Sequence, residues 1–137
     1  MTGEAEGDRP MAKTEIRTDG APKPGGSYSQ GIRAGNFVFT AGQVGIDPAT
    51  GKLAGDTIEA QTAQVLDNLT AVLAAAGATM ADVVKVTAFL TDMTQFAGYD
   101  AVYRTYFPEP RPARSTVGTK LAGDFLVEIE CVAVVAG

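Results

Sequence analysis

The chain has 137 residues, of which 45% are hydrophobic and 20% charged, and its formal net charge is −5, which fits one globular domain. The 11 basic residues are scattered, without the clustered Lys and Arg that a phosphate backbone requires, so the charge pattern argues against nucleic-acid binding. With no His and one Cys, the chain can form neither a His/Cys zinc site nor a Ser-His-Asp or Cys-His catalytic set, and we expect no metal and no cofactor.

The N-terminal segment, Met1 to Pro10, is small, polar and mostly acidic. It lacks the apolar stretch of a signal peptide, and no apolar run elsewhere reaches membrane-spanning length. A single Cys forms no intrachain disulfide, which suits a reducing compartment. We therefore expect a cytoplasmic protein that does not bind membranes. Residues 1–12 are expected to be a disordered tail or a remnant of expression, followed by one domain at 13–136.

The first part of the domain is predicted to be extended. Lys13 to Thr18 reads as a short strand. Residues 30–34 and 37–41 flank Gly35-Asn36, which is a two-residue hairpin signal. Residues 47–51, with the sequence DPATG, form a second turn between short extended pieces.

A helix is predicted from about Thr57 to Ala76. Asp56 is the expected N-cap, with Glu59 three residues later, and Gly77 lies at the expected end. Apolar residues recur at helical spacing, namely Ile58, Val65, Leu66, Leu69, Val72, Leu73 and Ala76. The polar residues Gln61, Gln64, Asp67 and Asn68 are expected largely on the opposite face.

The second part alternates strands and helices. A helical turn at 79–82 leads into a strand at 83–90, and a second helix is predicted at about 94–107. Its stripe of Phe96, Tyr99, Val102, Tyr103 and Tyr106 is interpreted as core packing. After three prolines come a strand at 113–118, a turn at 120–124 and a final strand at 125–135. The order predicts one α+β domain, a sheet with two helices packed on one face.

The final strand is apolar on both faces. Its odd positions from Phe125 to Val135 should face the helices, which makes Cys131 a buried, unreactive thiol. The even positions are Leu126, Glu128, Glu130, Val132 and Val134. Two helices cover only one face, so this second face meets solvent or another subunit. Together with Val38 from the hairpin, its apolar residues favour self-association.

Three residues are candidates for binding or chemistry. Arg114 starts a strand after a proline-stiffened loop, where its guanidinium could bind a carboxylate bidentately, or else pair with an acidic neighbour. Glu128 lies within an apolar strand and is expected to be functional or to pair with Arg114 across an interface. Tyr28 is either a packed aromatic or a ring that closes over a ligand.

Four sequence runs resemble the RidA (YjgF) family. They are Ser27-Tyr28-Ser29-Gln30-Gly31, Asn36-Phe37-Val38-Phe39-Thr40-Ala41-Gly42-Gln43, Pro112-Ala113-Arg114-Ser115-Thr116-Val117 and Val127-Glu128-Ile129-Glu130. The resemblance extends from about Lys13 to Val135. It implies a chorismate-mutase-like α+β fold and a homotrimer with ligand sites in clefts between subunits.

The resemblance also implies an activity, the hydrolysis of reactive enamines and imines from pyridoxal-phosphate enzymes to 2-oxo acids and ammonia. Arg114 matches the carboxylate-binding arginine of the family, Glu128 the acid associated with the attacking water, and Tyr28 a tyrosine that lines the site. The remaining matched positions are Thr116, whose carbonyl could help Glu128 to orient the water, Gly42, Phe96 and Asp100. Proximity would supply much of the rate, because the protonated imine is already electrophilic.

The chain departs from the family pattern at several positions. Asp100 stands where several members carry Asn, Thr116 replaces a Cys of some members, and Gly118 replaces a common Glu. The turn before Glu128 is one residue shorter than in many relatives, so Glu128 is aligned by the V-E-I-E run. Two other functions stay open: a non-catalytic binder of 2-oxo acids in the same cleft, and a ribonuclease or translation inhibitor, against which the acidic charge argues.

Overall fold

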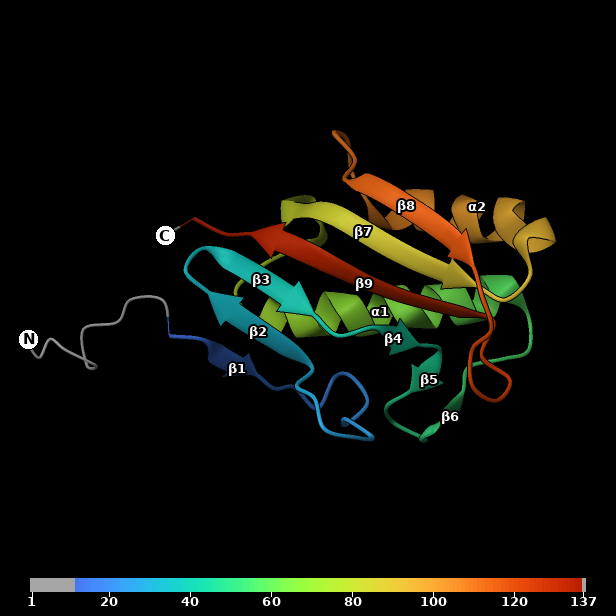
Figure 1. Ribbon diagram of the computed structural model, residues 1–137, viewed down its shortest axis with the longest axis horizontal. Coiled ribbons are helices and arrows are strands. Elements are labelled where there is room, and N and C mark those ends of the chain that lie inside the picture. Colours follow the sequence, from blue (N-terminus) through green and yellow to red (C-terminus); the bar gives the residue numbers. More distant parts are fainter. Residues whose placement is uncertain (1–11, 137) are drawn as a thin grey trace, which may run out of the picture.

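The structure is a computed structural model that describes residues 12–136, and the predicted N-terminal tail lies, up to residue 11, outside the described residues. One mixed sheet carries both long helices on a single face (Figure 1), as the sequence predicts. The sheet strands are β1 (Thr14–Ile16), β2 (Gly31–Ala34), β3 (Phe37–Thr40), β4 (Gln43–Val44), β7 (Val83–Leu90), β8 (Ala113–Gly118) and β9 (Val127–Val134). The helices are α1 (Ile58–Ala75), α2 (Phe96–Tyr106) and the 3-10 turns η2 (Met80–Asp82) and η3 (Met93–Gln95).

The strands lie in the order β1-β2-β3-β9-β7-β8, with β4 also paired to β9. Strands β7 and β8 are parallel because α2 connects them, and the other pairs of this sheet are antiparallel. The predicted hairpin is present, with Gly35 at a φ of 60° between β2 and β3. A separate pair, β5 (Ile46–Asp47) and β6 (Lys52–Leu53), flanks the second predicted turn. Neither long helix nor any 3-10 turn within residues 12–136 has the length and apolar character needed to cross a bilayer.

The N-cap of helix α1 lies one residue later than predicted, and the helix begins at Ile58. The side chain of Thr57, and not that of Asp56, accepts a hydrogen bond from the Ala60 backbone N–H at 3.1 Å. Glu59 therefore has no part in a capping box. The predicted end is confirmed, since Gly77 adopts a φ of 79° that favours glycine and the backbone N–H of Ala78 reaches the Leu73 carbonyl at 2.8 Å.

Two of the four polar residues of α1 that were expected largely on the outer face are buried. Gln61 is 1% exposed and binds the carbonyls of Gly55 and Asp124 and the N–H of Leu126. Asn68 is fully buried and donates to the carbonyls of Val44 and Ile46. Irregular backbone packs against the helix at both places, and an amide side chain satisfies its polar groups where Leu could not.

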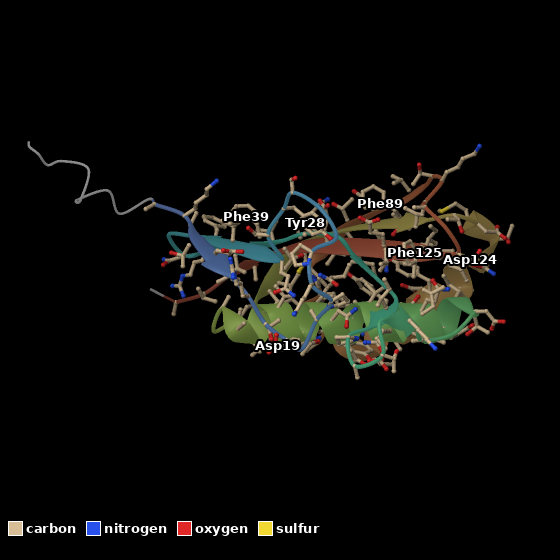
Figure 2. All side chains as sticks on the ribbon, turned by 90° about the horizontal axis from the view of Figure 1, so that it is seen from below. Asp19, Tyr28, Phe39, Phe89, Asp124 and Phe125 are labelled. Carbon is tan, nitrogen blue, oxygen red and sulfur yellow. The ribbon has the colours of Figure 1, made fainter. Side chains whose placement is uncertain are left out.

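From Val127 on, the two faces of the sheet differ as predicted for the final strand, whereas Phe125, which was expected to face the helices, lies before β9 and lines a cavity together with Glu128. Val127, Ile129, Cys131 and Ala133 face the helices and are buried, and burial raises the pKa of Cys131 to about 11. Val38 was expected on the outer face and is instead fully buried, while its neighbours Phe37 and Phe39 point outward. Figure 2 shows Phe39, Tyr28 and Phe89 on the side of the sheet away from α1.

Candidate functional site

Arg114 lies on the helix-covered face of β8. Its guanidinium carbon is 4.5 Å from the ring centroid of Tyr103, 5.3 Å from that of Phe96 and 5.5 Å from that of Tyr99. These three aromatic residues follow one another on α2 at helical spacing, so the helix presents its rings to the strand as one surface. Contact with π faces at these distances is attractive and keeps the guanidinium in a defined plane.

Asp100 forms a salt bridge with the same guanidinium group. One carboxylate oxygen accepts a hydrogen bond from Arg114 at 2.7 Å, and the other accepts one from Arg104 at 3.1 Å. The hydrogen bond from Arg114 is the largest cause that lowers the pKa of Asp100, and Arg104 adds to it. Asp100 therefore stays ionised and shares its charge between two cations. We call Arg114, Asp100, Phe96, Tyr99 and Thr116 the arginine cluster.

Thr116 joins this cluster through Tyr99. The two hydroxyls are 3.0 Å apart, and Thr116 lies two residues after Arg114 on the same face of β8. Burial raises the pKa of Tyr99, so this tyrosine is neutral at physiological pH. The cluster thus presents a cation, a fixed carboxylate and neutral hydroxyls.

Glu128 lies on the opposite, uncovered face, with Val44 and Phe89 as its neighbours on the adjacent strands. It lines a cavity of about 350 Å³ together with Tyr28, Gly42 and others, namely Ala41, Val44, Ala122 and Phe125. Tyr28 comes from the loop before β2, which is fastened by hydrogen bonds of the buried Gln30 to the backbone of Thr18, Ala21 and Pro22. We call Glu128, Gly42 and Tyr28 the glutamate cluster.

The surroundings of Glu128 favour the protonated form of its carboxyl group more than bulk water would. Partial burial raises the pKa of this carboxyl, and the negative charge of Glu130 raises it further. A carboxyl with a raised pKa is a stronger base once ionised and is suited to take a proton from water near neutral pH. No cluster of three or more Asp, Glu, Cys or His side chains that could hold a metal ion occurs within residues 12–136.

The Glu128 carboxyl group depends on a glycine beside it. A Cβ atom added at Gly42 would overlap the Glu128 carboxylate and lie 2.9 Å from its Cδ atom. Gly42→Ala is therefore expected to displace this carboxylate and to lower any Glu128-dependent turnover by about tenfold or more, since small displacements of a catalytic group are costly. The fold should survive because the end of a flexible side chain can move.

The control for this substitution is Gly25→Ala, because nothing lies within 4 Å of a Cβ atom added at Gly25, its φ is not positive, and the substitution keeps the backbone N–H that donates to the Tyr28 hydroxyl at 3.2 Å. Turnover and thermal melting should be measured for both variants. Equal turnover in the two variants would contradict a role for the position of Glu128.

The candidate residues thus divide into two groups. Arg114, Thr116, Phe96 and Asp100 lie together, and so do Tyr28, Gly42 and Glu128, but the sheet separates the two groups. Arg114 pairs in register with Val86, which pairs with Cys131, and these two are buried under the helices. Glu128 points the other way. One chain therefore does not bring Arg114 and Glu128 to a common ligand.

Some neighbours of Arg114 had no predicted role at the site. Tyr99 and Tyr103 were interpreted as core, which their burial confirms, but their rings also stack on the guanidinium. Arg104 was not singled out, although it follows Asp100 by four residues, a spacing at which opposite charges on a helix meet. That spacing is the sequence signal that would have found it.

The family model described as Endoribonuclease L-PSP matches residues 18–135. A RutC family protein of Pyrococcus horikoshii is 52% identical over 122 residues, which cover 88% of this chain and 97% of that protein. The chain belongs to the RidA/YjgF/RutC (L-PSP) family. This membership agrees with the resemblance of the four sequence motifs to RidA proteins. These motifs supply residues to both the arginine cluster and the glutamate cluster.

Two further RidA-family relatives come from Escherichia coli. A protein named 2-iminobutanoate/2-iminopropanoate deaminase is 42% identical over 128 residues, covering 90% of this chain and 98% of that protein. The structure of TdcF with bound serine has a TM-score of 0.85 and 37% identity, covering 90% of this chain and 99% of the other. The likeness confirms the predicted α+β, chorismate-mutase-like fold.

Proposed function

We propose that this RidA-family protein hydrolyses 2-imino acids, together with their enamine tautomers, to 2-oxo acids and ammonia. The proposal is carried by Arg114, whose guanidinium is held within the chain by Asp100 at 2.7 Å and by three aromatic rings. A guanidinium fixed in this way binds a small carboxylate with little loss of conformational freedom. The name of the deaminase from Escherichia coli supports the substrate class.

We further propose that a second copy of the chain completes the site, in a homotrimer. The uncovered sheet face carries Phe37 at 49% exposure, Phe39 at 44% and Val134 at 37%, an apolar surface that association would bury. The glutamate cluster lies on that same face. Because β8 is an edge strand of the sheet, a neighbouring subunit whose uncovered face packs against this edge would bring its Glu128 toward the arginine cluster, which a single chain does not achieve.

The mechanism follows from these groups. Arg114 binds the substrate carboxylate, and Glu128 takes a proton from a water molecule whose oxygen adds to the C=N carbon. The resulting carbinolamine collapses when an oxygen electron pair forms the C=O bond and the C–N bond breaks. Glu128 returns its proton to the nitrogen and then takes the hydroxyl proton as the C=O bond forms and ammonia leaves, so one protonated imine and one water give one 2-oxo acid, one ammonia and one proton that passes from Glu128 to solvent.

The pH dependence of this reaction tests the role of Glu128. Turnover is expected to fall as pH drops through the raised pKa of Glu128, because only the ionised carboxylate accepts a proton. Glu130→Gln removes a negative charge that raises this pKa, so the acid limb of kcat/KM should move to lower pH. Glu59→Gln, on α1, is the control and should leave the limb in place. A limb unmoved by Glu130→Gln would argue against Glu128 as the base.

The activity itself is tested by generating 2-iminobutanoate or 2-iminopropanoate with a threonine/serine dehydratase and following the loss of the imine. The protein should accelerate this loss well beyond the reaction in buffer. No acceleration by the folded, assembled protein would contradict the proposal and favour a binder without catalysis. RNA is a poor candidate substrate despite the family description, since the net charge is −5.

A further inference from the structure

A second cavity lies directly beside Arg114. It measures about 560 Å³ and is lined by Asp100, Tyr103, Arg104, Arg111, Pro112 and Arg114. Three of the 11 basic residues of the chain thus meet around one cavity in a protein of net charge −5. Such a concentration of positive charge, with Asp100 as the one acidic residue of the lining, attracts an anion with more than one negative charge.

The three guanidinium groups keep many donors available. Each has five N–H groups. Arg114 and Arg104 each give one hydrogen bond to a different oxygen of Asp100, at 2.7 and 3.1 Å. Arg111 gives one to Glu109 at 3.1 Å, a pair in which the Glu109 side chain is 79% exposed and which is therefore weak. Asp100 occupies the position between Arg104 and Arg114, so the N–H groups of these two residues that do not reach Asp100 are the donors left for a ligand.

Tyr103 forms part of the same wall. The residue is 3% exposed, and its hydroxyl has no hydrogen-bond partner among residues 12–136. Burial raises its pKa to about 12, so it keeps its proton and remains a donor. Because the hydroxyl oxygen itself is buried, the part of Tyr103 that faces the cavity is its ring, which stacks on the Arg114 guanidinium.

We propose that this cavity binds a second acidic group of the substrate, so that 2-imino acids with an acidic side chain, the imines of the aspartate and glutamate type, are preferred. The inference rests on the proposed function. Arg114 takes the carboxylate beside the imine carbon, and Arg104 and Arg111 take the carboxylate of the side chain. Arg114 and Arg104 both bind Asp100, so their guanidinium groups lie close together. This spacing suits two carboxylates that are joined by a short carbon chain.

The kinetic test compares imines generated in place by amino-acid oxidases. For the wild-type protein, kcat/KM for the imine of aspartate or glutamate should exceed that for 2-iminobutanoate by about tenfold or more. In Arg104→Gln/Arg111→Gln this ratio should fall by about tenfold, while Arg33→Gln removes a charge four strands away in the sheet and should leave the ratio unchanged. An unchanged ratio in the double variant, or no wild-type preference, would overturn the inference.

A binding measurement separates this inference from the proposed function. Calorimetry with the stable products, 2-oxoglutarate and 2-oxobutanoate, needs no turnover. Tighter binding of 2-oxoglutarate that Arg111→Gln weakens supports the acidic subsite even if no imine is hydrolysed. Equal affinity for the two 2-oxo acids would overturn the subsite, whatever the protein does to imines.

Discussion

Arg114→Ala is expected to lower kcat/KM for 2-iminobutanoate by at least about hundredfold, because it removes the charge-assisted hydrogen bonds that fix the substrate carboxylate. The loss of activity should be clearest at substrate concentrations well below KM, where the rate reports kcat/KM. The measurement is the rate of imine loss with and without the variant, under conditions in which the wild-type rate is proportional to protein concentration.

Two further variants distinguish charge from geometry. Arg114→Lys keeps the charge but not the planar fork or the stacking on Tyr103, so it should recover only part of the activity. Arg33→Ala, whose guanidinium contacts the Gly35 carbonyl at the far side of the sheet, should keep wild-type activity. Activity in Arg114→Ala equal to that of Arg33→Ala would exclude Arg114 as the anchor.

Folding is expected to survive the loss of Arg114. Asp100 keeps its hydrogen bond to Arg104 at 3.1 Å, so its carboxylate is not left without a cation. The rings of Tyr99 and Tyr103 stay in contact, with centroids 5.7 Å apart. A thermal melt of Arg114→Ala should therefore resemble that of the wild type far more closely than its activity does.

The elements that were predicted well are those whose pattern is dictated by burial. The strand at Val83–Leu90 is predicted to the residue, and the alternation in β9 correctly places Ile129 and Cys131 in the core. Burial selects apolar residues at a fixed period, so the period can be read back from the sequence. The Thr57 cap was missed because Asp56 and Thr57 are both good caps and only the backbone turn decides between them.

Where apolar and polar residues do not alternate along a strand, the sequence does not predict which face of the sheet each side chain takes. Phe37, Val38 and Phe39 are all apolar, so the sequence cannot tell which face each one takes, and Val38 was assigned to the wrong face. The same holds for β8, where Ala113 to Gly118 lacks alternation. The face that Arg114 occupies is set by its register with Val86 and by the rings of α2.

The division of the site into two clusters follows from the pairing of Arg114 on β8 with Val86 on β7, which puts Arg114 on the helix-covered face. The sequence placed Glu128 on the uncovered face from the parity of β9, and no pattern in β8 placed Arg114 on the other. A ligand shared between subunits is implied by the family resemblance, and the strand pattern alone does not predict it. The separation of the two clusters by the sheet now gives that idea a physical reason.

Mixing two inactive variants is expected to restore activity if neighbouring subunits share each site. Glu128→Gln alone should lower kcat by about hundredfold or more through loss of the base. When Glu128→Gln and Arg114→Ala chains are unfolded, mixed equally and refolded, a cyclic assembly regains intact Arg114–Glu128 pairs at about one quarter of its interfaces, so about one quarter of wild-type activity should return.

The matched control mixes Arg114→Ala with the double variant Arg114→Ala/Glu128→Gln, in which no subunit supplies Arg114, so activity should stay at background. Sedimentation establishes that every mixture has assembled as the wild type does. If the mixture of the two single variants stays inactive although its subunits have exchanged, the two clusters do not meet across an interface, and the inter-subunit site is wrong. Recovery in that mixture alone requires that Arg114 and Glu128 reach one ligand from different chains.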